Sequence, residues 1–170
     1  MFVAVDTFYF ENKAKTVAIT FDKWNDSNYS KQYTEELDIL VEYIPGEFYK
    51  RELPCILSII KNMNVDAIDV IIIDGYVYLD DFNKYGLGGY LYESLNKKIP
   101  IIGVAKTNFA SNKENKLELF RGKSKNPLYI TSIGIDIDVA KKYISSMYGE
   151  YRIPKLLKEL DQLTKEKNYG

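Results

Sequence analysis

The chain has 170 residues, of which 46% are hydrophobic and 28% charged, and its formal net charge is −1. This length and composition predict a single globular domain over residues 1–170 and argue against disordered and collagen-like classes. The chain contains no histidine and one cysteine, which argues against zinc, haem and iron–sulfur sites and excludes an imidazole base. Any chemistry must therefore fall to carboxylates, lysines, tyrosines or hydroxyls.

Charge and hydropathy also bear on location and partners. The balance of 23 basic and 24 acidic residues does not indicate sequence-independent binding of nucleic acid over the whole surface. No stretch approaches the roughly 18 apolar residues of a membrane span, and no basic region followed by an apolar run opens the chain. We expect a monomeric, cytoplasmic protein without a membrane partner.

The first quarter of the chain is predicted to be rich in strands. Phe2–Phe10 and Thr16–Phe21 are rich in β-branched and aromatic residues and flank residues 11–13, which predicts an antiparallel hairpin. The polar stretch Asn25–Gln32 is typical of a loop. Period-two alternation over Leu37–Tyr43 predicts a third strand.

The remainder of the chain alternates helices with strands. The apolar run Val70–Ile73 suits a strand covered on both faces, and with a helix over Leu87–Asn96 and a strand over Ile99–Ala105 it predicts a β-α-β unit. The other predicted elements are a helix from Pro54 to about Met63, a strand pair formed by Lys116–Phe120 and Leu128–Ser132, and helices over Asp138–Met147 and Pro154–Lys165. This order predicts an α/β fold with a mixed sheet.

Three acidic residues stand in or beside these elements and are candidates for a functional site. Asp6 lies inside the apolar first strand, where a carboxylate is costly unless it is paired, bound to a cation or turned to solvent on an edge strand. Asp74 ends the most apolar strand, either as a ligand at the carboxyl edge of the sheet or as part of an Asp-Gly turn. Glu52 lies just ahead of the predicted helix. If the three converge, they form an oxygen-rich site suited to Mg²⁺ or Mn²⁺.

Blocks of sequence along nearly the whole chain resemble the endonuclease V family. The most specific is the stretch 43–54, Tyr-Ile-Pro-Gly-Glu-Phe-Tyr-Lys-Arg-Glu-Leu-Pro, in which a Tyr-Ile-Pro-Gly turn is followed by Arg-Glu and a helix. Val5-Asp6, the Asp-Gly that ends the strand at residue 74, Gly-Val-Ala-Lys at 103–106 and Pro-Leu-Tyr-Ile-Thr-Ser at 127–132 follow in the family's order.

This resemblance implies a ribonuclease-H-like fold and a nuclease that cleaves DNA or RNA near deaminated bases, chiefly inosine, as in DNA repair. It implies Asp6, Glu52 and Asp74 as metal-binding carboxylates for Mg²⁺ or Mn²⁺, and Lys106 as a contact to phosphate or to the attacking water. It also implies that Tyr43, Ile44, Pro45 and Gly46 form a wedge beside the lesion, in a substrate that is single-stranded or locally melted.

The sequence departs from the family pattern at three places that matter for function, one of which is Glu42, ahead of the wedge, where a proline is usual. A histidine is expected at the turn after the last strand, where Ile133 or Gly134 stands, and Asp136 or Asp138 could supply a substitute carboxylate; Asp138 could equally cap the following helix. Val77 stands where the family has a glycine that shapes the base pocket, so base specificity stays open. The alternatives to a nuclease are therefore a nucleic-acid-binding module that has lost catalysis and an interaction domain.

Overall fold

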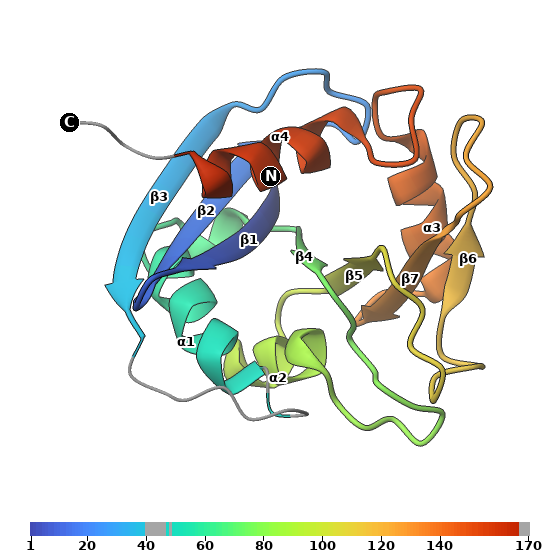
Figure 1. The fold of residues 1–170 in the computed structure, drawn as a ribbon, viewed down its shortest axis with the longest axis horizontal. Coiled ribbons are helices and arrows are strands. Elements are labelled where there is room, and N and C mark those ends of the chain that lie inside the picture. Colours follow the sequence, from blue (N-terminus) through green and yellow to red (C-terminus); the bar gives the residue numbers. More distant parts are fainter. Residues whose placement is uncertain (40–46, 48, 167–170) are drawn as a thin grey trace.

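The computed structural model describes residues 1–39, 47 and 49–166. Its strands are β1 Phe2–Phe10, β2 Lys13–Phe21, β3 Lys31–Asp38, β4 Val70–Asp74, β5 Ile101–Ala105, β6 Leu117–Leu119 and β7 Leu128–Ile133. They form one seven-stranded sheet in the order β3-β2-β1-β4-β5-β7-β6 (Figure 1). β1, β4 and β5 run parallel to one another, and the other neighbouring pairs are antiparallel. The predicted α/β class with a mixed sheet, including the hairpin and the β-α-β unit, is confirmed.

Helices cover both faces of this sheet. They are α1 Tyr49–Ile60, α2 Leu87–Ser94, α3 Ile137–Ser146 and α4 Lys155–Lys165, with a short 3-10 helix at Val65–Ala67. α1 and α2 pack on one face, and α3 and α4 pack on the other (Figure 1). Among the described helices, none combines the length and the apolar character that a membrane crossing requires.

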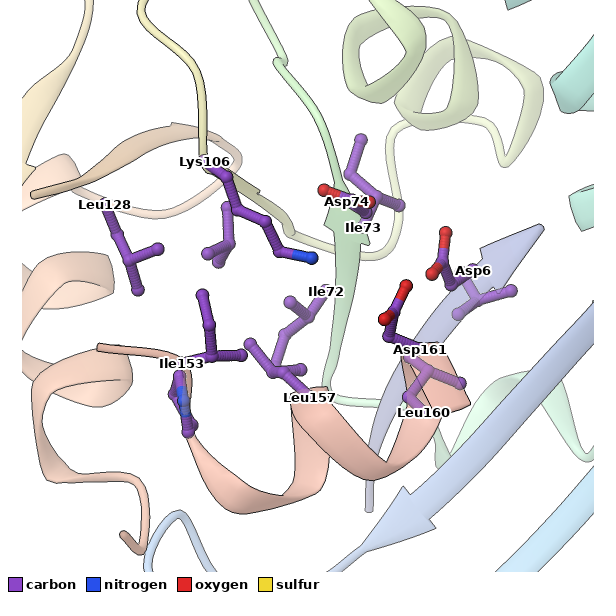
Figure 2. Close-up of a pocket in the computed structure, with 13 residues that line it drawn as sticks. Asp6, Ile72, Ile73, Asp74, Lys106, Leu128, Ile153, Leu157, Leu160 and Asp161 are labelled. Carbon is purple, nitrogen blue, oxygen red and sulfur yellow. The ribbon is translucent and has the colours of Figure 1, made fainter. Parts of the chain in front are cut away.

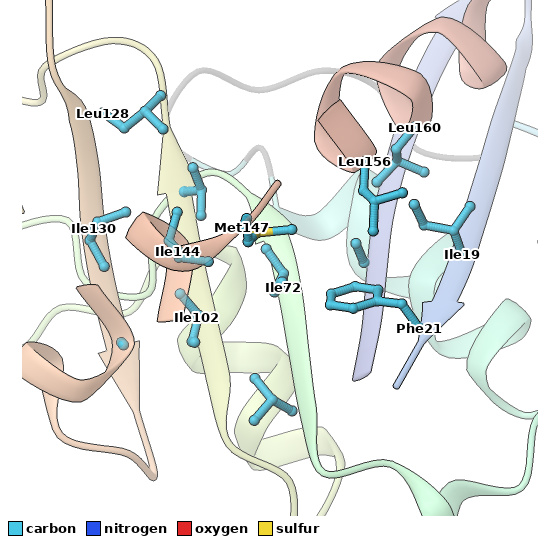
Figure 3. Close-up of a cluster of buried hydrophobic side chains, with 14 of the residues drawn as sticks. Ile19, Phe21, Ile72, Ile102, Leu128, Ile130, Ile144, Met147, Leu156 and Leu160 are labelled. Carbon is cyan, nitrogen blue, oxygen red and sulfur yellow. The ribbon is translucent and has the colours of Figure 1, made fainter. Parts of the chain in front are cut away.

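The central strand β4 shows why its sequence is a continuous apolar run. Ile71 and Ile73 pack in the cluster beneath α1 and α2, whereas Val70 and Ile72 pack in the cluster beneath α3 and α4. Figure 3 shows the second cluster, in which Ile72 lies between side chains from the sheet and from both helices. Full burial of each isoleucine contributes about 1.5–3 kcal/mol, so both helical layers are held against this strand.

The third strand lies earlier in the chain than its sequence predicted. Lys31 and Gln32 belong to β3 and not to a loop, Ile39 follows the strand, and residues 40–43 of the predicted strand lie outside the described residues. Within the part of the chain that the structure describes, β3 is an edge strand that pairs with β2 alone, and alternate side chains are exposed along most of its length. Backbone pairing, and not apolar content, therefore defines this strand, so its polar first residues, Lys31 and Gln32, are typical of a loop in sequence.

The first helix begins before the proline that was predicted to start it. α1 starts at Tyr49, so Glu52 lies in its first turn and not ahead of the helix. Pro54 lies within the helix, where the amide it lacks would have donated to the carbonyl of Lys50. The buried side chains of Cys55, Ile56, Ile59 and Ile60 hold the helix against the sheet despite this lost hydrogen bond.

Candidate active site

The parallel part of the sheet brings three of the predicted site residues together. In the register, Val5 of β1 pairs with Ile73 of β4, and Asp74 pairs with Val104 of β5. Asp6 follows Val5 and Asp74 follows Ile73, so the two aspartates lie side by side on neighbouring strands. Lys106 comes directly after β5. The carboxyl ends of parallel strands meet at one edge of the sheet, where ligand sites of α/β proteins collect.

These residues share a pocket with a carboxylate from the last helix. Asp6, Asp74, Lys106 and Asp161 line it above an apolar floor that includes Ile153, Leu157 and Leu160. Figure 2 shows the carboxylates of Asp6, Asp74 and Asp161 gathered on one side, with the Lys106 side chain extending toward them. The pocket therefore combines three carboxylates and one ammonium group at the edge of an apolar surface.

Glu52 reaches the same carboxylates from the opposite helical layer. Its side chain is 4% exposed, and it lines a neighbouring pocket together with Asp6 and Asp74. The first turn of α1 carries it there because the rest of the helix is fixed by apolar packing on the sheet. Asp6 and Asp74 thus belong to both pockets, with Glu52 on one side and Asp161 on the other.

The backbone that follows Asp74 is fixed by a close approach to β5. A side chain at Gly103 would bring its Cβ to 2.5 Å from both the Gly75 carbonyl oxygen and the Thr131 hydroxyl, so only glycine fits there. The Thr131 hydroxyl in turn accepts a hydrogen bond of 2.8 Å from the Val77 amide. The turn that ends β4 is therefore held in place, and Asp74 with it.

Burial and mutual repulsion raise the pKa values of the clustered carboxyl groups. The pKa of Asp6 rises to about 7, chiefly because the group is buried, and the negative charges of Asp74 and Asp161 raise it further. The Thr7 amide, which donates a hydrogen bond to Asp6 Oδ1 at 2.9 Å, lowers this pKa, and so does the positive charge of Lys106. Asp74 is exposed at the end of β4, but the protein atoms around its carboxyl group partly desolvate it and raise its pKa, while Lys106 lowers it. Burial, followed by the charges of Asp6 and Asp74, raises the pKa of Glu52 well above its ordinary value.

The chemistry of this cluster fits a hard divalent cation. A bound cation would offset the repulsion between these neighbouring carboxylates. Carboxylate oxygens are also the ligands that Mg²⁺ and Mn²⁺ prefer. Among residues 1–39, 47 and 49–166, no three carboxylate or thiol side chains have the arrangement of a finished metal site. Mg²⁺ is commonly bound through one or two carboxylates together with water and substrate phosphate, and Asp6 and Asp74 suit that mode.

The structure does not bring every predicted residue to this pocket. The carboxylate of Asp136 caps α3 by accepting hydrogen bonds from the amides of Asp138 and Val139, so Asp136 and not Asp138 is the N-cap. The predicted wedge residues Tyr43, Ile44, Pro45 and Gly46 lie outside the described residues.

The position at which a histidine was expected is also remote from the pocket. β7 runs antiparallel to β5, so Ile133 pairs with Ile101, at the opposite end of β5 from Lys106. Gly134 lies against the Pro100 backbone at that same end. A histidine at 133 or 134 would therefore not reach the carboxylates, because neither position lines either pocket.

Asp161 is the site residue that sequence reasoning missed. It lies on the inward face of α4 with Leu157, Leu160 and Thr164, a spacing of three and four residues that marks one side of a helix. Its side chain is 19% exposed and pairs with Lys165 at 3.1 Å. An aspartate on an otherwise apolar helical face was the available signal.

Comparison with known proteins gives a consistent family. The family model for endonuclease V matches residues 1–162. The endonuclease V of Pyrococcus abyssi is 32% identical over 164 residues, which cover 96% of this chain and 78% of that protein. Among solved structures, the endonuclease V of Streptomyces avermitilis has a TM-score of 0.73 at 20% identity, covering 96% of this chain and 78% of that one.

A second structural match supports the same fold. The endonuclease V of Ciona intestinalis, solved in complex with a 24mer DNA containing an inosine followed by a ribo-adenosine, has a TM-score of 0.78 at 16% identity and covers 96% of this chain and 83% of that one. The expected ribonuclease-H-like fold is confirmed by these likenesses. The extent of the family match, together with the relative from Pyrococcus, shows that this chain belongs to the endonuclease V family.

Proposed function

We propose that this chain is a Mg²⁺- or Mn²⁺-dependent endonuclease that hydrolyses phosphodiester bonds in DNA or RNA. The observation that carries the proposal is the convergence of Asp6, Asp74, Asp161 and Lys106 on one pocket, with Glu52 buried beside it. The match to the endonuclease V family over residues 1–162 supports the same activity.

The residues of the pocket have distinct tasks in this mechanism. Asp6 and Asp74 would hold the cation, with Glu52 and Asp161 adding negative charge on either side. When bound, the cation supplies positive charge that stabilises the phosphate oxygens as negative charge develops on them. Lys106 lies beside the same carboxylates and would contact the phosphate or orient the attacking water. No histidine is needed for these tasks.

We infer that the substrate is presented as a single-stranded or locally melted segment near inosine. The inosine-containing DNA bound by the Ciona protein motivates this choice. Val77 is completely buried beneath α2, and a Cβ at Gly88 would lie only 2.7 Å from its side chain. Val77 therefore packs in the core and offers no surface to a base, so any preference for inosine must arise from other residues.

A cleavage assay tests this function directly. Single-stranded and duplex oligonucleotides of DNA and RNA, with and without one inosine, are incubated with Mg²⁺, with Mn²⁺ and with EDTA. We expect metal-dependent cleavage that Asp74→Asn abolishes and that Asp66→Asn, a change at an exposed aspartate, leaves intact. Absence of cleavage on every substrate, or cleavage that Asp74→Asn does not affect, would contradict the proposal.

A binding module without catalysis is the second candidate, and one observation favours it. The described carboxylates do not form a finished three-ligand metal site. On this hypothesis, oligonucleotide binding survives EDTA and no strand is cut. Binding that disappears when the metal is removed would count against it.

A further inference from the structure

Arg121 is a buried arginine whose acceptors are all main-chain carbonyls. Its side chain is 6% exposed, and it follows β6 by two residues. One Nη donates to the carbonyls of Tyr151 and Arg152 at 2.6 and 3.5 Å, and the other donates to those of Met147 and Gly149 at 2.7 and 3.1 Å. These four carbonyls belong to the loop between α3 and α4, residues 147–154, which we call the α3–α4 loop.

The neighbouring glycine seats the same loop. Gly122 has a φ of +59°, and a Cβ there would lie 2.1 Å from the Glu150 carbonyl oxygen. The backbone of the α3–α4 loop can therefore lie directly on the Arg121–Gly122 turn. Two consecutive residues thus fix the loop, one by donating hydrogen bonds and the other by having no side chain.

The α3–α4 loop is connected to the pocket in two ways, through the backbone of Lys106 and through the pocket floor. Arg152 donates to the Lys106 carbonyl at 2.5 Å and to the Pro127 carbonyl at 2.7 Å, which ties the loop to the residue after β5. Ile153 and Pro154 line the pocket floor and lead into α4, which carries Asp161. The backbone of Lys106 and the start of the helix that presents Asp161 are therefore both attached to the loop that Arg121 holds.

We propose that Arg121 and Arg152 are positioning residues that fix Lys106 and Asp161 relative to each other across the pocket. The inference rests on the proposed function in so far as Lys106 and Asp161 act in catalysis. Neither arginine lines the pocket that holds the carboxylates, so both act through the groups they hold.

Arginine is suited to this task in a way that lysine is not. A guanidinium has five donors in a rigid plane and can serve four carbonyls at once, whereas an ammonium has three donors around a point charge. The described residues offer Arg121 no ion pair, so its charge is balanced only by carbonyl dipoles. Arg121→Lys should therefore hold the α3–α4 loop in part, whereas Arg121→Met should not hold it.

Hydrogen exchange in the apo protein tests the structural half of the proposal without any activity. We expect Arg121→Met to increase amide exchange in residues 147–153 and in the first turn of α4, and Arg121→Lys to increase it less. The matched control is Lys123→Met, which removes an exposed cation from the same turn. If exchange in the α3–α4 loop equals that of the wild type, the proposal is wrong. Should Arg121→Met fail to fold, Arg121→Lys and Arg152→Lys carry the same comparison.

Kinetics test the functional half. We expect Arg121→Met and Arg152→Met to lower kcat on the order of 10- to 100-fold with KM within about threefold, because displaced catalytic groups chiefly affect the chemical step. Added to a protein that already carries Lys106→Met and Asp161→Asn, Arg121→Met should cost less than about twofold. A full additional loss in that background would show an unrelated effect and overturn the proposal. If the wild type cleaves nothing, the proposed function fails, and the exchange experiment alone decides the inference.

Discussion

We expect Asp6 to lower the stability of the metal-free protein at neutral pH, and Asp6→Asn to remove this effect. Burial, followed by the charge of Asp74, raises the pKa of Asp6 from its ordinary 3.8 to about 7. Between about pH 4 and pH 7 the folded state holds a proton that the unfolded state has released, so stability falls as the pH rises through this window. A pKa difference of about 3 corresponds to about 4 kcal/mol by pH 8, of which about one third is already lost at pH 5.

Urea unfolding in EDTA at pH 5 and pH 8 measures this difference. Asn has the shape of Asp and can still accept the hydrogen bond from the Thr7 amide. We predict that the advantage of Asp6→Asn over the wild type grows by about 2–3 kcal/mol from pH 5 to pH 8. Mn²⁺ should reduce the advantage, because the ion stabilises only the protein that binds it.

The control is Asp66→Asn, at an exposed aspartate, which should behave alike at the two pH values. If the advantage of Asp6→Asn is the same at pH 5 and pH 8, or if the variant is less stable than the wild type at pH 8, the pKa of Asp6 is not raised in the folded state.

Three further predictions concern the same site. Lys106→Met should lower kcat on the order of 100-fold, and Lys106→Arg should restore part of the rate; equal rates for wild type and Lys106→Met would contradict its role. Asp161→Asn should lower the pKa of Asp6 below about 7, since the charge of Asp161 helps to raise it; carboxyl ¹³C titration measures this, and an unchanged pKa would place Asp161 too far away. Ile133→His should bring no gain in cleavage rate, because Ile133 pairs with Ile101 at the far end of β5 from Lys106, and a rate increase would refute that placement.

Much of the fold could be predicted because apolar runs and alternation reflect burial. The run Val70–Ile73 indicated a strand covered on both faces, and β4 is packed between two helical layers. β3 could not be placed in the same way, because an edge strand is defined by backbone pairing to β2 and one side of it faces solvent. Similarly, the proline rule placed the start of α1 too late, since apolar packing tolerates Pro54 inside the helix.

The site was predictable in part for a comparable reason. Asp6, Asp74 and Lys106 lie at the ends or in the middle of parallel strands, and the strand order alone brings such residues to one edge. The positions of Asp161 and Ile133 relative to the pocket depend on the direction of β7 and on the packing of α4. The periodicity of the sequence reveals neither. Once β7 is known to be antiparallel, its far end leads away from the pocket, and the return of α4 across the sheet supplies the additional carboxylate.

The most direct test of the central claim is a crystal structure of the protein soaked in Mn²⁺, with the ion located by its anomalous scattering. We predict a peak between the carboxylates of Asp6 and Asp74, within reach of Glu52 or Asp161, and its loss in Asp74→Asn. Mn²⁺ bound elsewhere, or no peak at a Mn²⁺ concentration that supports cleavage, would contradict a metal-dependent nuclease built on these carboxylates.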